Sequence, residues 1–202
     1  MTRENANGQV EYSYEGGLLY DRQDGWGVET TADGTRYEGY FTKGKRGPSG
    51  KWFLRNGNVY EGEFLNGLMH GRGKLTNDVN KTSYEGDWKQ GKMHGQGVYL
   101  WEDGRRYQGE YESDKKKGFG AYMWVDGRVY YGMWKDGVQH GEGTTVNPNR
   151  QMRKSLWEAG KESMQLEIVE AEKQEILEYV AQMQKEKERL IAEGRIRRTT
   201  NN

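Results

Sequence analysis

One spacing dominates this sequence: a tyrosine recurs every 23 residues, with a single interval of 24. A strict period of this length over most of a chain is typical of repeat proteins, in which each unit packs mainly against its neighbours in sequence. The period therefore predicts an open stack of like units and disfavours the alternative, a closed globular barrel. The repeating residues are Tyr14, Tyr37, Tyr60, Tyr84, Tyr107 and Tyr130.

Each unit has the pattern of a β-hairpin. A glycine lies two residues after every repeating tyrosine, and a large apolar side chain lies four residues after it. Alternation of this kind places all three positions on one face of a strand. Most units close with a dipeptide that supplies the positive φ angles of tight turns. We therefore expect two short antiparallel strands per unit, with closing turns at Asp33-Gly34, Asn56-Gly57, Asp103-Gly104 and Asp126-Gly127.

The aromatic rings of both strands are expected to share one face of the sheet. On the second strand the rings lie in phase with paired glycines, so they join the rings of the first strand. Cross-strand ring contacts then supply much of the stability, and the same face offers a groove to a protein partner. For each single ring, a purely structural role is the alternative. The predicted partner-binding groove consists of Tyr84, Trp88, Tyr99, Trp101, Tyr107, Tyr111, Tyr122, Trp124, Tyr130 and Trp134.

The segment from Tyr84 to Gly97 reads YEGDWKQGKMHGQG and resembles a complete MORN (membrane occupation and recognition nexus) repeat. The resemblance covers residues 14–160 as six repeats plus a terminal half-repeat, because Trp157 lies one period after Trp134. It implies a mainly β fold, a single elongated antiparallel sheet of hairpins curved as a half-pipe. It also implies roles in axonemal and other cytoskeletal assemblies, in membrane junctions or beside lipid kinases, without catalysis by the repeats.

The segments that flank the repeats have a different composition. Residues 1–13 are polar, with room for one edge strand, and residues 195–202 form a basic and polar tail. From 161 to 194 good helix formers replace glycine, which predicts a long, charged amphipathic helix. Its apolar stripe can pack on the chain's own aromatic groove, on a second copy in a coiled coil, or on a different partner, which we favour. The predicted docking residues of this helix are Leu166, Val169, Ile176, Val180, Met183 and Leu190.

Composition and motifs argue against an enzyme. Lys plus Arg and Asp plus Glu are equal at 31 each, a balance that is not typical of a nucleic-acid binder. The sequence has no cysteine for a disulfide or a thiolate metal site. Residues 39–45 and 86–92 read like phosphate-binding loops, but neither continues with the Ser or Thr that binds magnesium. We therefore predict no catalytic residue, metal, cofactor or small-molecule substrate.

Basic residues gather in the turns inside the repeats, along one predicted edge of the sheet. Such an edge could meet anionic lipid, although lysine at an edge also discourages aggregation between sheets. We expect a non-catalytic scaffold of the ciliary axoneme, similar to radial spoke MORN proteins, or of a related cytoskeletal structure in the cytoplasm. The alternative is a phosphoinositide-binding adaptor at a membrane. The basic edge consists of Lys43, Lys45, Arg46, Lys89, Lys92, Lys115, Lys116, Lys117 and Lys135.

Overall fold

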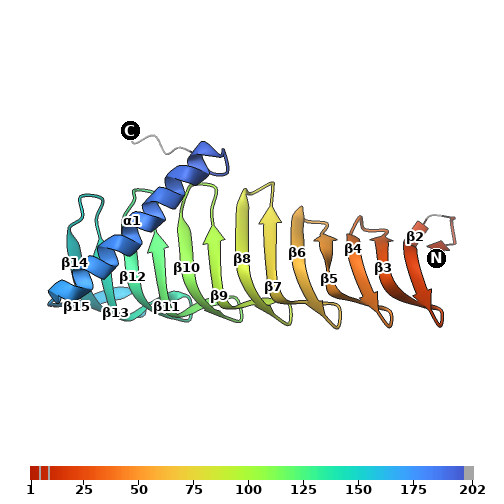
Figure 1. The fold of residues 1–202 in the computed structure, drawn as a ribbon, viewed down its shortest axis with the longest axis horizontal. Coiled ribbons are helices and arrows are strands. Elements are labelled where there is room, and N and C mark those ends of the chain that lie inside the picture. The colour runs from red at the N-terminus through yellow and green to blue at the C-terminus, as the bar shows by residue number, and fades with distance from the viewer. Residues whose placement is uncertain (5, 9, 198–202) are drawn as a thin grey trace. The chain divides into compact units, whose positions relative to one another are not determined.

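A computed structural model of the chain describes residues 1–4, 6–8 and 10–197. They form one open antiparallel sheet of fifteen strands, each hydrogen-bonded to its neighbours in sequence, followed by one helix (Figure 1). The predicted fold class, a single antiparallel sheet with a C-terminal helix, is confirmed. The chain divides into two compact units, Met1–Lys92 and Met93–Asn202, and each unit is described by itself.

The first unit contains the hairpins of the first three repeats and the opening strand of the fourth. A short strand before them pairs with the first long strand, within the polar segment where the sequence left room for an edge strand. The strands are β1 (Thr2–Glu4), β2 (Val10–Leu19), β3 (Arg22–Thr31), β4 (Arg36–Thr42), β5 (Lys45–Phe53), β6 (Asn58–Leu65), β7 (Leu68–Asn77) and β8 (Thr82–Lys89).

The second unit contains the remaining strands and the helix. Its strands are β9 (Lys92–Leu100), β10 (Arg106–Glu112), β11 (Lys115–Met123), β12 (Val129–Lys135), β13 (Val138–Val146), β14 (Met152–Glu158) and β15 (Lys161–Leu166), and its helix is α1 (Glu170–Ala192).

Two kinds of turn connect the strands. The predicted closing turns form, but only the glycine of each pair, such as Gly104 (φ 85°), has the expected positive φ. Inside each hairpin, two residues with positive φ reverse the chain, such as Asn66 (φ 53°) and Gly67 (φ 84°). These values belong to the turn type that matches the twist of paired strands. Between hairpins, the first residue of the Asp-Gly pair fixes the turn through its side chain: the Asp103 carboxylate accepts a hydrogen bond from the backbone N–H of Arg105 at 3.0 Å.

A last hairpin replaces the start of the predicted helix. Residues 161–166 form the strand β15, which pairs with β14, and α1 begins only at Glu170, so the predicted range of 161–194 was wrong at its N-terminal end. The reason is the repeat itself, because Ala159 (φ 48°) and Gly160 (φ 80°) form the same two-residue turn as in the other repeats. Pairing with a neighbouring strand then outweighs the helical propensity of this polar segment.

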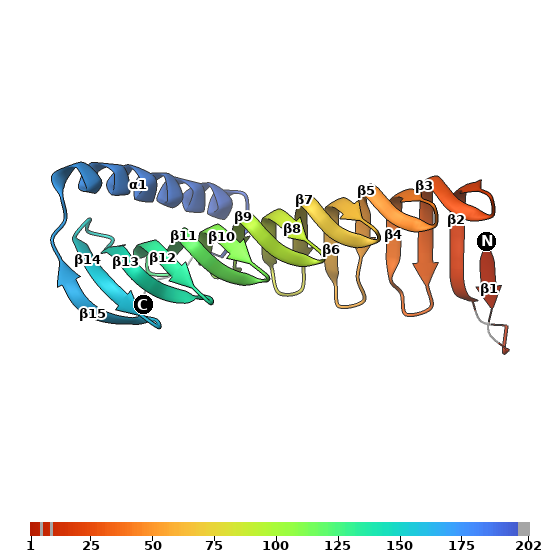
Figure 2. The same ribbon diagram turned by 90° about the horizontal axis from the view of Figure 1, so that it is seen from below.

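The helix packs on the sheet of its own unit. Both views show α1 crossing the strands of the second unit, from β15 towards β10 (Figures 1 and 2). Its side chains Ile176, Val180 and Met183 are buried in one cluster with residues of three strands, namely Ala121, Met123, Val129 and Val146. Consecutive residues of a strand point to opposite faces. Since Val129 contacts the helix and Tyr130 belongs to the ring stack, α1 covers the face opposite the repeating tyrosines.

Candidate partner-binding face

The repeating tyrosines form a ladder of edge-to-face ring contacts. Four of the tyrosines, Tyr37, Tyr60, Tyr107 and Tyr130, each contact the second ring of their own repeat and that of the following repeat. Tyr60, for example, lies 5.1 Å from Phe64 and 5.3 Å from Trp88 between ring centroids. In the second unit, Tyr107 lies 5.1 Å from Tyr111 and 5.3 Å from Trp134. T-shaped pairs at this separation are attractive beyond the apolar area that they bury. The ladder is therefore the core of the repeats.

The paired glycines exist to admit these rings. A Cβ atom on Gly120 would lie 2.4 Å from the hydroxyl of Tyr107, and one on Gly73 would lie 2.2 Å from that of Tyr60. The tyrosine rings thus lie flat over glycine backbone. Each hydroxyl then donates a hydrogen bond to the carbonyl three residues on, as from Tyr60 to Glu63 at 2.9 Å. Burial raises the pKa of Tyr37 to about 12, because the ionised phenolate would lose its hydration.

Most of the predicted groove residues belong to this core and are closed to a partner. In the first unit, Tyr84 and Trp88 are 1% and 4% exposed. In the second unit the buried rings are Tyr107, Tyr111, Tyr122, Tyr130 and Trp134. The prediction that these seven rings form an open groove was wrong, because all seven are buried in the core of the repeats.

Three of the predicted rings remain partly open to solvent, and all of them lie in the second unit. Tyr99, Trp101 and Trp124 are half-buried, and they join Tyr122 in a continuous contact series. The ring centroids of Tyr99 and Trp101 are 4.4 Å apart, those of Trp101 and Tyr122 5.8 Å, and those of Tyr122 and Trp124 5.0 Å. We call Tyr99, Trp101, Tyr122 and Trp124 the ring row.

Three cations lie over the ring row. The guanidinium of Arg105 is 5.3 Å from the ring of Trp101, and that of Arg128 is 5.3 Å from the ring of Trp124. Each arginine also pairs with an aspartate of its turn, Asp103 at 2.7 Å and Asp126 at 2.6 Å. The third cation, Lys116, lies among the rings. Its burial and the nearby charge of Arg105 lower its pKa from 10.5 to about 8.

The predicted docking residues of the helix divide into two groups. Ile176, Val180, Met183 and Leu190 are buried, with Leu190 packed against Leu100 and Ile196. The other two precede the helix: Leu166 ends β15, and Val169, at the N-cap, is 62% exposed. The apolar stripe therefore docks on the chain's own sheet, and our preference for a different partner on this stripe was wrong.

The sequence prediction missed the apolar sheet face that receives α1. Ala121 and Tyr131 contribute to this face, whereas three repeats earlier the equivalent positions are Lys51 and Glu61. In the first unit the ammonium of Lys51 instead forms an ion pair with Glu61 at 3.4 Å. The signal lies in the positions between the rings, where the charged pair Lys51 and Glu61 of the first unit is replaced by Ala121 and Tyr131 in the second.

The predicted basic edge is only partly formed. Exposed turn residues are Lys43, Lys45, Lys89, Lys92, Lys115, Lys117 and Lys135. Two of them are paired with carboxylates in the second unit, Lys115 with Asp136 at 3.2 Å and Lys117 with Glu112 at 2.8 Å. Arg46 and Lys116 do not belong to the edge, because their long side chains turn inward over aromatic rings. Lipid binding by the remaining lysines stays a prediction.

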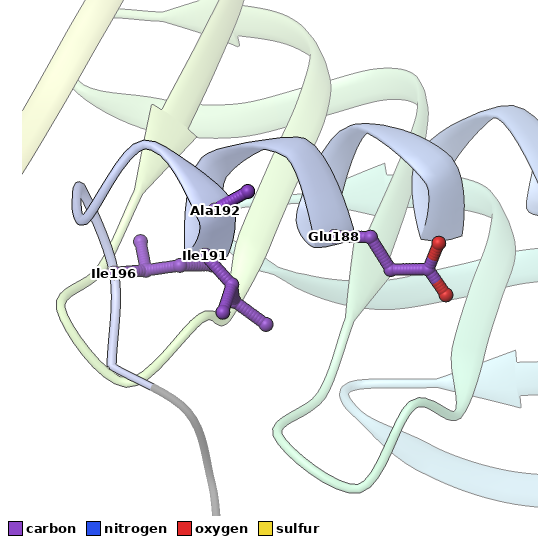
Figure 3. Close-up of a pocket in the computed structure, with 4 residues that line it drawn as sticks. All are labelled: Glu188, Ile191, Ala192 and Ile196. Carbon is purple, nitrogen blue, oxygen red and sulfur yellow. The ribbon is translucent and has the colours of Figure 1, made fainter.

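We also searched the described residues for a metal site, a membrane-spanning helix and a substrate pocket. Among residues 1–4, 6–8 and 10–197, no group of three or more His, Cys, Asp or Glu side chains could hold a metal ion. The helix in this part of the chain is too polar to cross a membrane. A recess of about 400 Å³ lies at the C-terminal end of α1, lined by Glu188, Ile191, Ala192 and Ile196 (Figure 3). Among the described residues, its lining side chains are one carboxylate and three apolar groups.

Comparison with known sequences agrees with this repeat geometry. The MORN repeat profile matches residues 14–36, 60–78, 84–105, 107–127 and 130–152, more than half of the sequence. The chain belongs to the MORN-repeat family. MORN repeats are non-enzymatic and mediate protein or lipid interactions, so this is a protein-binding or membrane-associated repeat protein. The MORN profile does not match residues 37–59, where Gly47-Pro48-Ser49 departs from the repeat pattern. The hairpin forms there nevertheless, with Tyr37 opposite Trp52 and Gly39 opposite Gly50.

Comparisons with individual proteins add little to the MORN assignment. No curated protein sequence matched the chain. Among solved structures, a match is described as "SAS-4 (dCPAP) TCP domain in complex with a Proline Rich Motif of Ana2 (dSTIL) of Drosophila Melanogaster". It is 10% identical, with a TM-score of 0.42, and covers 77% of this chain and 90% of that chain. A likeness this weak supports no argument about function.

Proposed function

We propose that this MORN protein is a non-catalytic scaffold that binds a segment of a protein partner along the ring row. One observation carries the proposal: three of the four rings of the ring row stay partly open to solvent while the chain's own helix covers the opposite face of the second unit. Had α1 docked on the rings, the aromatic face would be fully explained as core. Instead the helix leaves Tyr99, Trp101 and Trp124 accessible, beyond what the ladder of buried tyrosines needs.

The composition of the ring row suits protein recognition. Tryptophan, tyrosine and arginine are the residues that most often carry the binding energy of protein interfaces. Here Trp101 and Trp124 each have an arginine over the ring, and each arginine is held in place by an aspartate of the same turn. The rings are therefore partly pre-positioned, which reduces the entropy that binding would cost.

The binding role is tested by comparing the two faces of the second unit. The double variant Trp101→Ala/Trp124→Ala is expected to remain folded and to lose its partner, since both side chains are half-buried at the ends of strands. Phe119→Ala/Met133→Ala is the matched control, because these side chains are 42% exposed on the helix-bearing face. Quantitative pull-down followed by mass spectrometry measures binding, and circular dichroism measures folding. Equal partner recovery by both double variants would refute the proposal.

The proposal includes the cellular setting, an assembly of the ciliary axoneme or of a related cytoskeletal structure in the cytoplasm. Its support is membership of the MORN-repeat family together with the expectation, from the sequence, of a similarity to radial spoke MORN proteins. A tagged copy expressed in ciliated cells is expected to follow the axonemal microtubules. Concentration of the tagged protein at the plasma membrane, with none along the axoneme, would contradict this part of the proposal.

The exposed turn lysines support a second candidate, a phosphoinositide-binding adaptor at a membrane. Each lysine near an anionic bilayer contributes about 1 kcal/mol, but pairing of Lys115 and Lys117 with neighbouring carboxylates reduces that attraction. Sedimentation with phosphoinositide vesicles at low and physiological salt separates the candidates. Strong binding with a steep salt dependence would favour the membrane adaptor, and no binding at low salt would remove it.

A further inference from the structure

Lys116 has surroundings that no other lysine of the described turns shares. Its Nζ atom lies 4.6 Å from the ring centroid of Tyr122, 4.7 Å from Trp134, 5.1 Å from Tyr107 and 5.6 Å from Trp101. Four rings thus form a cup around one ammonium group. Within the described part of the chain, this ammonium has no hydrogen bond or ion pair to an oxygen atom. Cation–π attraction alone offsets part of its lost hydration.

The first unit contains an equivalent cup of rings around Arg46, and that cup includes a carboxylate that the cup around Lys116 lacks. The guanidinium of Arg46 lies 5.3 Å from the ring of Tyr37 and 4.7 Å from that of Trp52. Three repeats separate Arg46 from Lys116, and the same offset relates these two rings to Tyr107 and Tyr122. In the first unit, however, the cation also binds a carboxylate.

That carboxylate belongs to Glu29, whose Oε2 atom lies 2.6 Å from a terminal nitrogen of Arg46 and 2.8 Å from its Nε. Three repeats later, in the second unit, the position equivalent to Glu29 is occupied by Tyr99. The cup of rings is therefore repeated, but the anion that completes it is replaced by a neutral ring. A half-buried ammonium without an acidic partner is costly, and an incoming carboxylate would gain a strong charge-assisted hydrogen bond.

Carboxylates of the neighbouring turns are already engaged. Asp103 binds Arg105, Glu112 binds Lys117, and Asp136 binds Lys115, each by a side-chain ion pair. Arg105 adds a second positive charge near Lys116, as its lowering of the pKa of Lys116 indicates. The cup is thus a small region of net positive charge at the centre of the ring row.

We propose that Lys116 is the anchor for an aspartate or glutamate side chain of the bound protein segment. The acidic side chain would pair with the half-buried ammonium of Lys116 from the solvent side, and apolar residues beside it would contact Trp101 and Trp124. This inference rests on the proposed function and adds the chemistry of the partner: an acidic residue flanked by apolar ones. A membrane is a poorer occupant, because the exposed Lys115 and Lys117 would meet a flat surface before an ammonium that lies among rings.

The test selects peptides from a random twelve-residue display library on three full-length proteins: wild type, Lys116→Met and Lys117→Met. Lys117→Met is the matched control, because its ammonium is exposed and already paired with Glu112. Wild type and Lys117→Met are expected to enrich peptides with Asp or Glu at one fixed position beside apolar residues. Lys116→Met is expected to lose that preference, and an enriched peptide should bind it at least about tenfold more weakly.

A fourth variant, Tyr99→Glu, supplies the missing carboxylate from within the chain. By analogy with Glu29 and Arg46, it should pair with Lys116 and abolish the preference for acidic peptides while leaving the chain folded. Peptides selected without an acidic preference, or with one that persists in Lys116→Met, would overturn the inference and leave the proposed function standing. If no peptide is selected, or if phosphoinositide vesicles bind through Lys116 instead, both proposals fail.

Discussion

Replacing Gly73 by alanine tests the claim that glycines of this sheet exist to seat tyrosine rings. A Cβ at Gly73 would lie 2.2 Å from the Tyr60 hydroxyl, whereas ordinary contact begins near 3.4 Å. The ring must therefore rise by more than 1 Å. That movement breaks the 2.9 Å hydrogen bond from the Tyr60 hydroxyl to the carbonyl of Glu63 and misaligns the ring contacts with Phe64 and Trp88.

The magnitude follows from these contacts. Two edge-to-face ring pairs contribute about 0.5–1.5 kcal/mol each, and the hydrogen bond contributes about 1 kcal/mol. Gly73→Ala should therefore lower the free energy of unfolding by about 3 kcal/mol. For a chain of this length, that loss corresponds to a fall in Tm of roughly 6–12 °C.

A double-mutant cycle isolates the ring contact. In a Tyr60→Leu background the distal ring atoms that approach Gly73 are absent, so the added methyl group should cost little there, or stabilise by restricting the unfolded chain. Thermal unfolding followed by circular dichroism on the four proteins gives the coupling energy, expected at about 3 kcal/mol. Equal losses from Gly73→Ala in both backgrounds would refute the reasoning.

Three further predictions concern the helix, the tyrosines and the indole groups. Met183→Ala should cost about 3 kcal/mol by leaving a cavity under α1, and hydrogen exchange should then rise in α1; unchanged exchange would contradict the docking. Burial raises the pKa of Tyr37 to about 12, so the stability that this phenol confers is present below pH 10 and is lost as the pH rises from 10 towards 12. The free energy of unfolding measured in urea should therefore fall across that range, and a constant value would contradict this prediction. Trp134→Phe should cost about 1 kcal/mol more than Trp157→Phe, because the indole N–H of Trp134 donates to the Gly120 carbonyl at 3.0 Å, whereas that of Trp157 has no hydrogen-bond partner among the described residues. Equal losses in urea unfolding would contradict this assignment.

Most of the local structure could be predicted from the sequence because the residue spacing and the turn residues within each repeat determine its hairpin. A tyrosine, a glycine two residues later and a second ring four residues later can occupy one strand face only if the strand is extended. The pairs with positive φ, such as Asn66-Gly67, then fix where the hairpin reverses. Both rules act over a few residues, so they could be applied without knowledge of the rest of the fold.

Two of the errors, the start of the helix and the extent of the groove, came from interactions that local patterns do not contain. Residues 161–166 have a composition typical of helix, but the turn at Ala159 and Gly160 delivers them to the edge of an existing sheet. The predicted groove was too large for a related reason: counting rings does not reveal that Trp134 covers Tyr107. Burial of one repeat by the next is a tertiary property and became visible only in the structure.

The docking site of α1 was in principle readable from differences between repeats. At the positions facing away from the rings, the first unit has charged residues such as Lys51 and Glu61, and the second has Ala121 and Tyr131. Where repeats keep their rings but become apolar on the opposite face of the sheet, that opposite face is expected to pack against another element. On the ring face, Tyr99 occupies the repeat position of Glu29, so the cup around Lys116 lacks the carboxylate that Arg46 binds.

The central claim is that the ring row binds a protein partner while the opposite face of the second unit is occupied by α1. Site-specific photo-crosslinking in the native assembly tests it most directly, with p-benzoyl-phenylalanine at Trp124 on the ring row or at Phe119 on the opposite face. Mass spectrometry of the crosslinked peptides is expected to find segments of axonemal or other cytoskeletal chains from position 124, and only peptides of this chain from position 119. Partner peptides from position 119 alone, with none from position 124, would contradict the account.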